Sequence, residues 1–104
     1  MRQITQNAIN AFQNRVPFNQ ANTTVLVVGQ TVELRLHGNL IASRDSAGTL
    51  RVSSAGWETK TTKERLNGLP GVSINQSKGQ WYLNGRKWEQ PHVMTAVEPA
   101  TANA

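Results

Sequence analysis

Basic and aromatic side chains gather in the second half of the chain, and their chemistry suits a polyanion. From Trp57 to Trp88 there are six basic residues against two acidic ones, a local net charge of +4. Lysine and arginine bind phosphates, and aromatic rings stack on bases. The sequence therefore predicts a nucleic-acid-binding set made of Lys60, Lys63, Arg65, Lys78, Tyr82, Arg86 and Lys87, with Trp57 as a second ring that could meet a base.

Strand geometry limits how many of these side chains can share one face. If Trp81 is in the core, Tyr82 points the other way, because successive side chains of a strand alternate. Arg86 and Lys87 likewise face opposite sides. For the three tryptophans, core packing is the alternative to a binding role, since each carries a large apolar area.

The charge of the whole chain agrees with an anionic partner. The 104 residues include eleven Lys and Arg against six Asp and Glu, a formal net charge of +5. Such a field favours DNA, RNA or an acidic protein surface, although it also suits a moderately basic soluble domain. We find no helix-turn-helix spacing, zinc finger or RNA-recognition aromatic pair. The alternative is therefore a protein-binding module that inhibits or recruits another protein through a strand edge or the aromatic hairpin.

Enzymatic chemistry has little support in the sequence. His37 could act as a general base, but no acidic residue is close in sequence to orient it. A turn in which Gly38 and Asn39 adopt positive φ explains this segment better. The chain has no cysteine and two histidines. We therefore expect no catalytic residue, no metal site and no cofactor.

The elements that position these residues predict an α+β fold. An amphipathic pattern over residues 4–16 indicates a helix that ends before Pro17. Four β-branched or alternating runs, over residues 23–28, 31–36, 40–44 and 50–53, predict an antiparallel meander. The spacing from Thr61 to Glu64 predicts a capping box at the start of a short second helix. Residues 72–88 then form strands, and Asn84-Gly85 is a strong type I′ hairpin signal.

The domain organisation predicted is one α+β domain over residues 1–88 and a flexible tail over residues 89–104, which are rich in small residues and proline. No apolar run is long enough to cross a membrane, so we expect no membrane partner and a cytoplasmic location. An exposed strand edge would also permit a homodimer.

Four blocks of the sequence together resemble a family of small proteins of tailed bacteriophages, over roughly residues 1–88. The blocks are residues 37–42 (HGNLIA), 56–57 (GW), 61–67 (TTKERLN) and 81–88 (WYLNGRKW). The resemblance implies expression in the cytoplasm of an infected bacterium. It favours a DNA-associated or host-directed accessory role and implies no particular activity. Together with the charge pattern, it leads us to expect a phage accessory protein that binds nucleic acid non-specifically.

Overall fold

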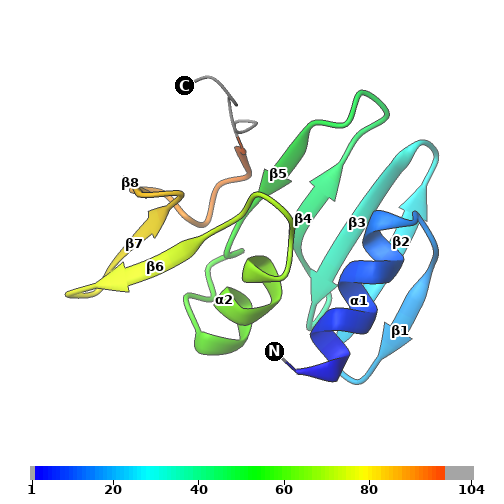
Figure 1. Cartoon of the computed structure of the whole chain (residues 1–104), viewed down its shortest axis with the longest axis horizontal. Helices are drawn as coiled ribbons and strands as arrows, with labels where there is room; N and C mark the ends of the chain where they lie inside the picture. Colours follow the sequence, from blue (N-terminus) through cyan, green and yellow to red (C-terminus); the bar gives the residue numbers. More distant parts are fainter. Residues whose placement is uncertain (1, 98–104) are drawn as a thin grey trace.

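The computed structural model describes residues 2–97, which form two helices and nine strands (Figure 1). The helices are α1 (Gln3–Gln13) and α2 (Lys60–Asn67). A six-stranded antiparallel sheet has the order β1-β2-β3-β4-β5-β9. Its strands are β1 (Phe18–Gln20), β2 (Thr23–Val28), β3 (Thr31–Leu36), β4 (Asn39–Arg44), β5 (Leu50–Val52) and β9 (Thr95–Ala96). A second sheet contains β6 (Ile74–Ser77), β7 (Gln80–Leu83) and β8 (Arg86–Lys87). The predicted α+β class and antiparallel meander are confirmed.

One face of the large sheet is covered and the other is wet. In β3, Val32, Leu34 and Leu36 are buried, whereas Glu33 and Arg35 pair with each other on the opposite face. Figure 1 shows α1 lying across the sheet, and α1 and α2 both contact it. The predicted alternation of β3 is therefore confirmed, and the core lies between the sheet and the helices.

Tight turns set the strand register. Lys78-Gly79 and Asn84-Gly85 both have positive φ at each of their two residues, as a type I′ turn requires. The β3–β4 turn is of the same kind, but its positive φ values belong to His37 (52°) and Gly38 (80°). The prediction that Asn39 would share this role is wrong, because Asn39 is the first residue of β4 and pairs with Leu36.

Helix α2 is capped by a different residue from the one predicted. The hydroxyl of Thr59 accepts a hydrogen bond from the Thr62 amide at 3.2 Å, so Thr59 is the N-cap. Thr61 lies inside the first turn, and Glu64 turns away from the helix start to bond the amide of Arg2 and the hydroxyl of Thr5. The predicted capping box is therefore wrong, and the start of the helix lies two residues earlier.

The folded domain continues past Trp88, where the sequence predicts a tail. Strand β9 pairs with β5, and the Trp88 indole donates to the Thr95 hydroxyl at 3.0 Å. Pro91 also accepts a 2.6 Å hydrogen bond from the Ser54 amide. These contacts show that the predicted boundary at residue 88 is wrong. The sequence did not reveal them because the segment is short, contains proline and has no strand pattern of its own. The rest of the predicted tail, residues 98–104, lies outside the described residues.

No helix within residues 2–97 is long and apolar enough to span a membrane.

Candidate nucleic-acid interface

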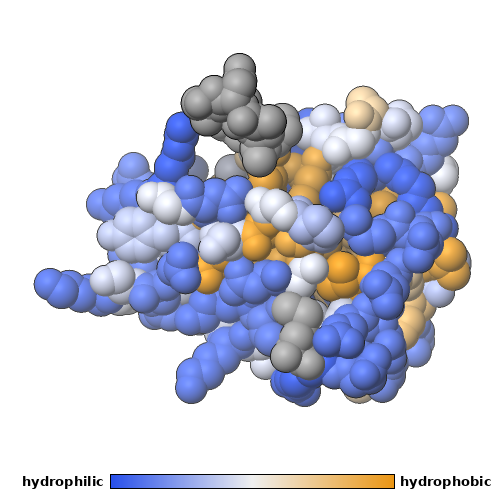
Figure 2. Space-filling view, in the orientation of Figure 1, coloured by the Kyte–Doolittle hydropathy of each residue, from blue (hydrophilic) through white to orange (hydrophobic). Residues whose placement is uncertain are grey.

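Three of the predicted cations line one shallow groove between α2 and β6. Lys60 and Lys63 come from α2, and Lys78 comes from the β6–β7 turn. The other polar lining residues are the amides Asn67, Asn75 and Gln76 and the carboxylate Glu64. Figure 2 shows hydrophilic residues covering α2 and the β6–β7 hairpin on this side of the molecule. The fold thus brings together basic residues that are up to eighteen positions apart in the sequence, as counted from Lys60 to Lys78.

Asn67 fixes the geometry of this groove. Its side-chain oxygen accepts from the Ile74 amide at 2.6 Å, and its side-chain nitrogen donates to the Ile74 carbonyl at 3.2 Å. This reciprocal pair holds the last turn of α2 against the start of β6. The two walls of the groove are therefore joined by hydrogen bonds as well as by packing.

The three lysines differ in how strongly they are held. The Lys63 ammonium donates to the Gln76 side-chain oxygen at 2.6 Å and lies 5.6 Å from the centre of the Trp81 ring. Lys60 and Lys78 are exposed, and within residues 2–97 their side chains make no hydrogen bond, ion pair or ring contact. Lys63 is thus ordered by protein partners, whereas Lys60 and Lys78 present their charge to solvent.

The hairpin divides the remaining predicted residues between its two faces. Tyr82 pairs with Lys87 across β7 and β8, and Leu83 pairs with Arg86. Because Trp81 is buried, Tyr82 and Lys87 lie on the opposite face from it, as the alternation predicts. Arg86 is on the same side as Leu83. The predicted set is therefore not one patch, since Tyr82 and Lys87 face away from Trp81 and from the side that Lys63 covers.

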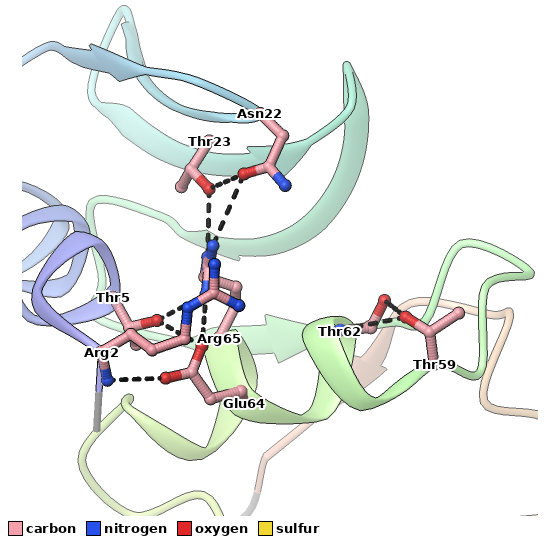
Figure 3. A network of polar contacts seen from close by, with 8 residues as sticks. All are labelled: Arg2, Thr5, Asn22, Thr23, Thr59, Thr62, Glu64 and Arg65. Carbon is pink, nitrogen blue, oxygen red and sulfur yellow. Dashed lines mark hydrogen bonds and ion pairs between the residues drawn. The ribbon is translucent and has the colours of Figure 1, made fainter.

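Arg65 is not a surface residue, and the prediction that it contacts nucleic acid is wrong. Its side chain is 0% exposed. The guanidinium donates to Thr5 at 2.6 Å, to Thr23 at 3.0 Å and to Asn22 at 3.5 Å, and it forms an ion pair with Glu64 (Figure 3). Arg65 thereby joins α2, α1 and the start of β2 in the interior.

Helical spacing contains a signal that would have identified this role. Thr62, Arg65, Leu66 and Leu69 follow the spacing of one helical face, and all four are buried. The arginine occupies a position on the apolar face of α2. Lys60 and Lys63 belong to the other faces of the same helix.

The pKa values of Glu64 and Arg65 are shifted by burial and by the groups that surround them. Burial alone would raise the pKa of Glu64, but hydrogen bonds from Thr5 and the Arg2 amide, with the charge of Arg65, hold that pKa below its ordinary value. Burial lowers the pKa of Arg65, and Glu64 opposes that shift. Glu64, the one carboxylate of the described part of the chain that lines the groove, is thus already engaged by protein donors.

A second hollow, which we call the Trp57 pocket, lies on the other side of the start of α2. It has a volume of about 500 Å³ and is lined by residues that include His37, Asn39, Trp57, Thr59 and Thr61. Trp57 is 59% exposed, whereas Trp81 and Trp88 are 2% and 5% exposed. The core interpretation is therefore right for Trp81 and Trp88 and wrong for Trp57. Sequence reasoning did not find this pocket, because its walls come from the β3–β4 turn and the segment before α2.

His37 takes part in this pocket through its place in the turn. Its backbone amide donates to the Asn22 carbonyl at 2.8 Å, which anchors the turn to the start of β2. Residues 2–97 contain no group of three or more His, Cys, Asp or Glu side chains placed to hold a metal ion.

Comparison with known families places the chain. A family model described as the Kyanoviridae Gp96 protein matches residues 1–97. The chain belongs to this family. The resemblance to small phage proteins is thereby confirmed, and the match extends across the segment 89–97 that completes the sheet. No curated protein and no solved structure matches the chain.

Proposed function

We propose that this phage protein is a non-enzymatic accessory protein that binds nucleic acid non-specifically in the cytoplasm of the infected host, without a cofactor. The observation that carries the proposal is the convergence of Lys60, Lys63 and Lys78 on one groove between α2 and β6. Lysines on a shared groove neutralise consecutive phosphates, and the release of counterions supplies affinity without sequence selection.

The state of the acidic residues supports this proposal. Among residues 2–97, Glu64 is the only acid that lines the groove, and its oxygens already accept from Arg2, Thr5 and Arg65. Its negative charge is thus compensated inside the protein. Tyr82, Arg86 and Lys87 lie on the neighbouring hairpin and do not line the groove, and Tyr82 and Lys87 are on the opposite face of the hairpin from Trp81.

The test is a binding titration with a matched charge control. Fluorescence anisotropy would follow binding to labelled single- and double-stranded DNA and RNA at low salt. Lys60→Gln with Lys78→Gln removes two charges from side chains that have no partner within residues 2–97. Arg35→Gln with Arg51→Gln removes the same charge from the wet face of the large sheet, where the arginines pair with Glu33 and Asp45.

We expect the lysine variant to lose about 2 kcal/mol of binding free energy, roughly thirtyfold in affinity, if each lysine contributes about 1 kcal/mol. The arginine variant should lose much less. No binding by the wild type even at low salt, or equal losses in both variants, would refute the proposal.

A second candidate function, docking on a host or phage protein, is favoured by the outer end of β2. Strand β1 pairs only with Thr23–Val25, and Leu26, Val27 and Val28 beyond it are 40–56% exposed. Consecutive exposed apolar residues next to a strand edge suit addition of a partner strand, including one from a second copy of the chain. A protein partner captured by the wild type and by the lysine variant, but not by Leu26→Ser with Val28→Ser, would favour this function.

A further inference from the structure

We propose that the Trp57 pocket receives an unpaired base of a single-stranded nucleic acid, which stacks on the Trp57 ring while the adjoining backbone follows Lys60 into the groove. This inference rests on the proposed function and specifies the form of nucleic acid that the protein prefers.

The first observation is the exposure of Trp57. The chain has three tryptophans, and two of them are almost completely buried in the core. Trp57 instead leaves 59% of its surface in solvent and lines a pocket of about 500 Å³. A volume of this size falls within the range of small-ligand sites, and an exposed ring at its edge provides a stacking surface.

The second observation is that the segment before α2 holds Trp57 firmly. Its amide donates to the Ser54 carbonyl at 2.9 Å, closing a turn whose central residues, Ala55 and Gly56, have φ values of 54° and 89°. The hydroxyls of Ser53 and Ser54 accept from the amides of these two central residues. A left-handed alanine is unfavourable, so the surrounding hydrogen bonds must impose this turn. The ring is therefore presented by a fixed backbone.

The third observation is the chemistry of the pocket walls. Leu36 and Ile41 are apolar, while His37, Asn39 and Thr61 carry side-chain groups that make no hydrogen bond within residues 2–97. A base offers flat apolar faces and polar edges, which match these two kinds of wall. Among residues 2–97 no acidic side chain lines the pocket, and Glu58, which lies between Trp57 and Thr59 in the sequence, accepts a 3.0 Å hydrogen bond from the Ser54 hydroxyl.

The fourth observation is the position of the pocket relative to the groove. Thr59 and Thr61 line the pocket, whereas Lys60 and Lys63 line the groove, so the two sites share the first turn of α2. A base in the pocket is thus bound beside Lys60, the groove residue that lies between Thr59 and Thr61 in the sequence. Charge complementarity favours a polyanion over an uncharged aromatic ligand at this position. A duplex keeps its bases stacked and paired, so the pocket discriminates in favour of single strands.

The test compares two probes that have the same phosphates. One is a fluorescein-labelled oligo(dT), and the other is an oligomer of equal length in which the bases are replaced by abasic sites. We expect the wild type to bind oligo(dT) about tenfold more tightly than the abasic oligomer, in line with the strength of base–aromatic stacking. Trp57→Ala should bind both probes equally, at the affinity of the wild type for the abasic oligomer. Trp57→Phe should keep most of the preference.

Two controls separate this inference from the proposed function. The exposed position of Trp57 predicts that its variants keep the thermal unfolding midpoint of the wild type, which circular dichroism would check. The Lys60→Gln, Lys78→Gln variant should weaken binding to both probes by a similar factor. Equal wild-type affinity for the two probes, with a loss in the lysine variant, would overturn the pocket and leave the groove in place. Absence of binding to either probe would overturn both.

Discussion

The buried ion pair of Arg65 and Glu64 gives the most quantitative prediction of this structure. Glu64→Gln preserves the size of the side chain and one acceptor oxygen, and it removes the negative charge together with the second oxygen, which accepts from the Arg2 amide. The Arg65 guanidinium would then remain 0% exposed with hydroxyl and amide partners but no counter-charge. Leaving a buried charge uncompensated costs about 3–5 kcal/mol. Since the Glu64 side chain is 24% exposed, solvent screens part of the interaction, and we expect a smaller loss of about 2–3 kcal/mol.

Glu33→Gln is the matched control for this substitution. Glu33 also pairs with an arginine, at 2.9 Å, and its side chain is 18% exposed, close to the value for Glu64. Its partner Arg35 is 32% exposed, however, so water can replace the lost carboxylate. We expect this variant to lose less than about 1 kcal/mol. The comparison therefore contrasts a buried arginine with a partly exposed one, and the Glu64 variant additionally loses the acceptor of the Arg2 amide.

Urea unfolding followed by tryptophan fluorescence would measure both variants, because Trp81 and Trp88 are buried in the native state. For a domain of this size the Glu64→Gln loss corresponds to a fall in Tm of roughly 10–20 °C. A cost no larger than that of Glu33→Gln would refute the assignment of Arg65 as a buried, charge-compensated residue.

The same pair predicts a dependence on pH. The pKa of Glu64 is lowered in the folded protein, so its contribution to stability is present above the unfolded pKa of about 4.3 and is lost as the pH falls through the folded value. The stability difference between wild type and Glu64→Gln should therefore shrink as the pH falls below the unfolded pKa of about 4.3. A difference that stays constant below that pH would contradict the lowered pKa.

Three further substitutions test local features of the fold by urea unfolding. Thr59→Ala should lower the free energy of unfolding by about 1 kcal/mol, because it removes the N-cap of α2, and Thr61→Ala should lower it by less than half as much. A larger loss for Thr61→Ala than for Thr59→Ala would instead support the capping box that starts at Thr61. Gly68→Ala should destabilise the protein by about 1–3 kcal/mol, because its Cβ would lie 2.8 Å from the Cγ1 atom of Ile9. A gain in stability would show that the Ile9 side chain or α1 can shift to make room at little cost. Asn84→Ala should cost about 2 kcal/mol, because the Asn84 side chain bonds Ser73 and Gly71 at 2.7 and 2.9 Å; an unchanged midpoint would mean that the turn does not need these bonds.

The parts of the fold that the sequence predicted well are those governed by local patterns. The alternation of β3, the turn at Asn84-Gly85 and the helical stripe of α1 each arise from residues close together in the chain. Strand β9 was missed because its extended structure depends on pairing with β5 and on the hydrogen bond from Trp88 to Thr95. No local sequence pattern reveals these two contacts.

The candidate site was predicted in part for the same physical reason. Local composition identified Lys60, Lys63 and Lys78 as cations, but only the tertiary fold shows that they share a groove. Arg65 was misplaced because a charge was assumed to face solvent, although its spacing from Leu66 and Leu69 puts it on the buried face of α2. The Trp57 pocket required the β3–β4 turn to meet the segment before α2, a contact between distant parts of the chain.

The salt dependence of binding tests the basic groove most directly. The slope of log K against log[salt] for oligo(dT) would be measured for the wild type, for Lys60→Gln with Lys78→Gln, and for Arg35→Gln with Arg51→Gln. Each lysine that contacts a phosphate contributes about 0.7 to the slope on a single strand, so the lysine variant should have a slope shallower by about 1.4. The arginine variant should keep the wild-type slope. The same slope in all three proteins would contradict a phosphate-binding role for the groove.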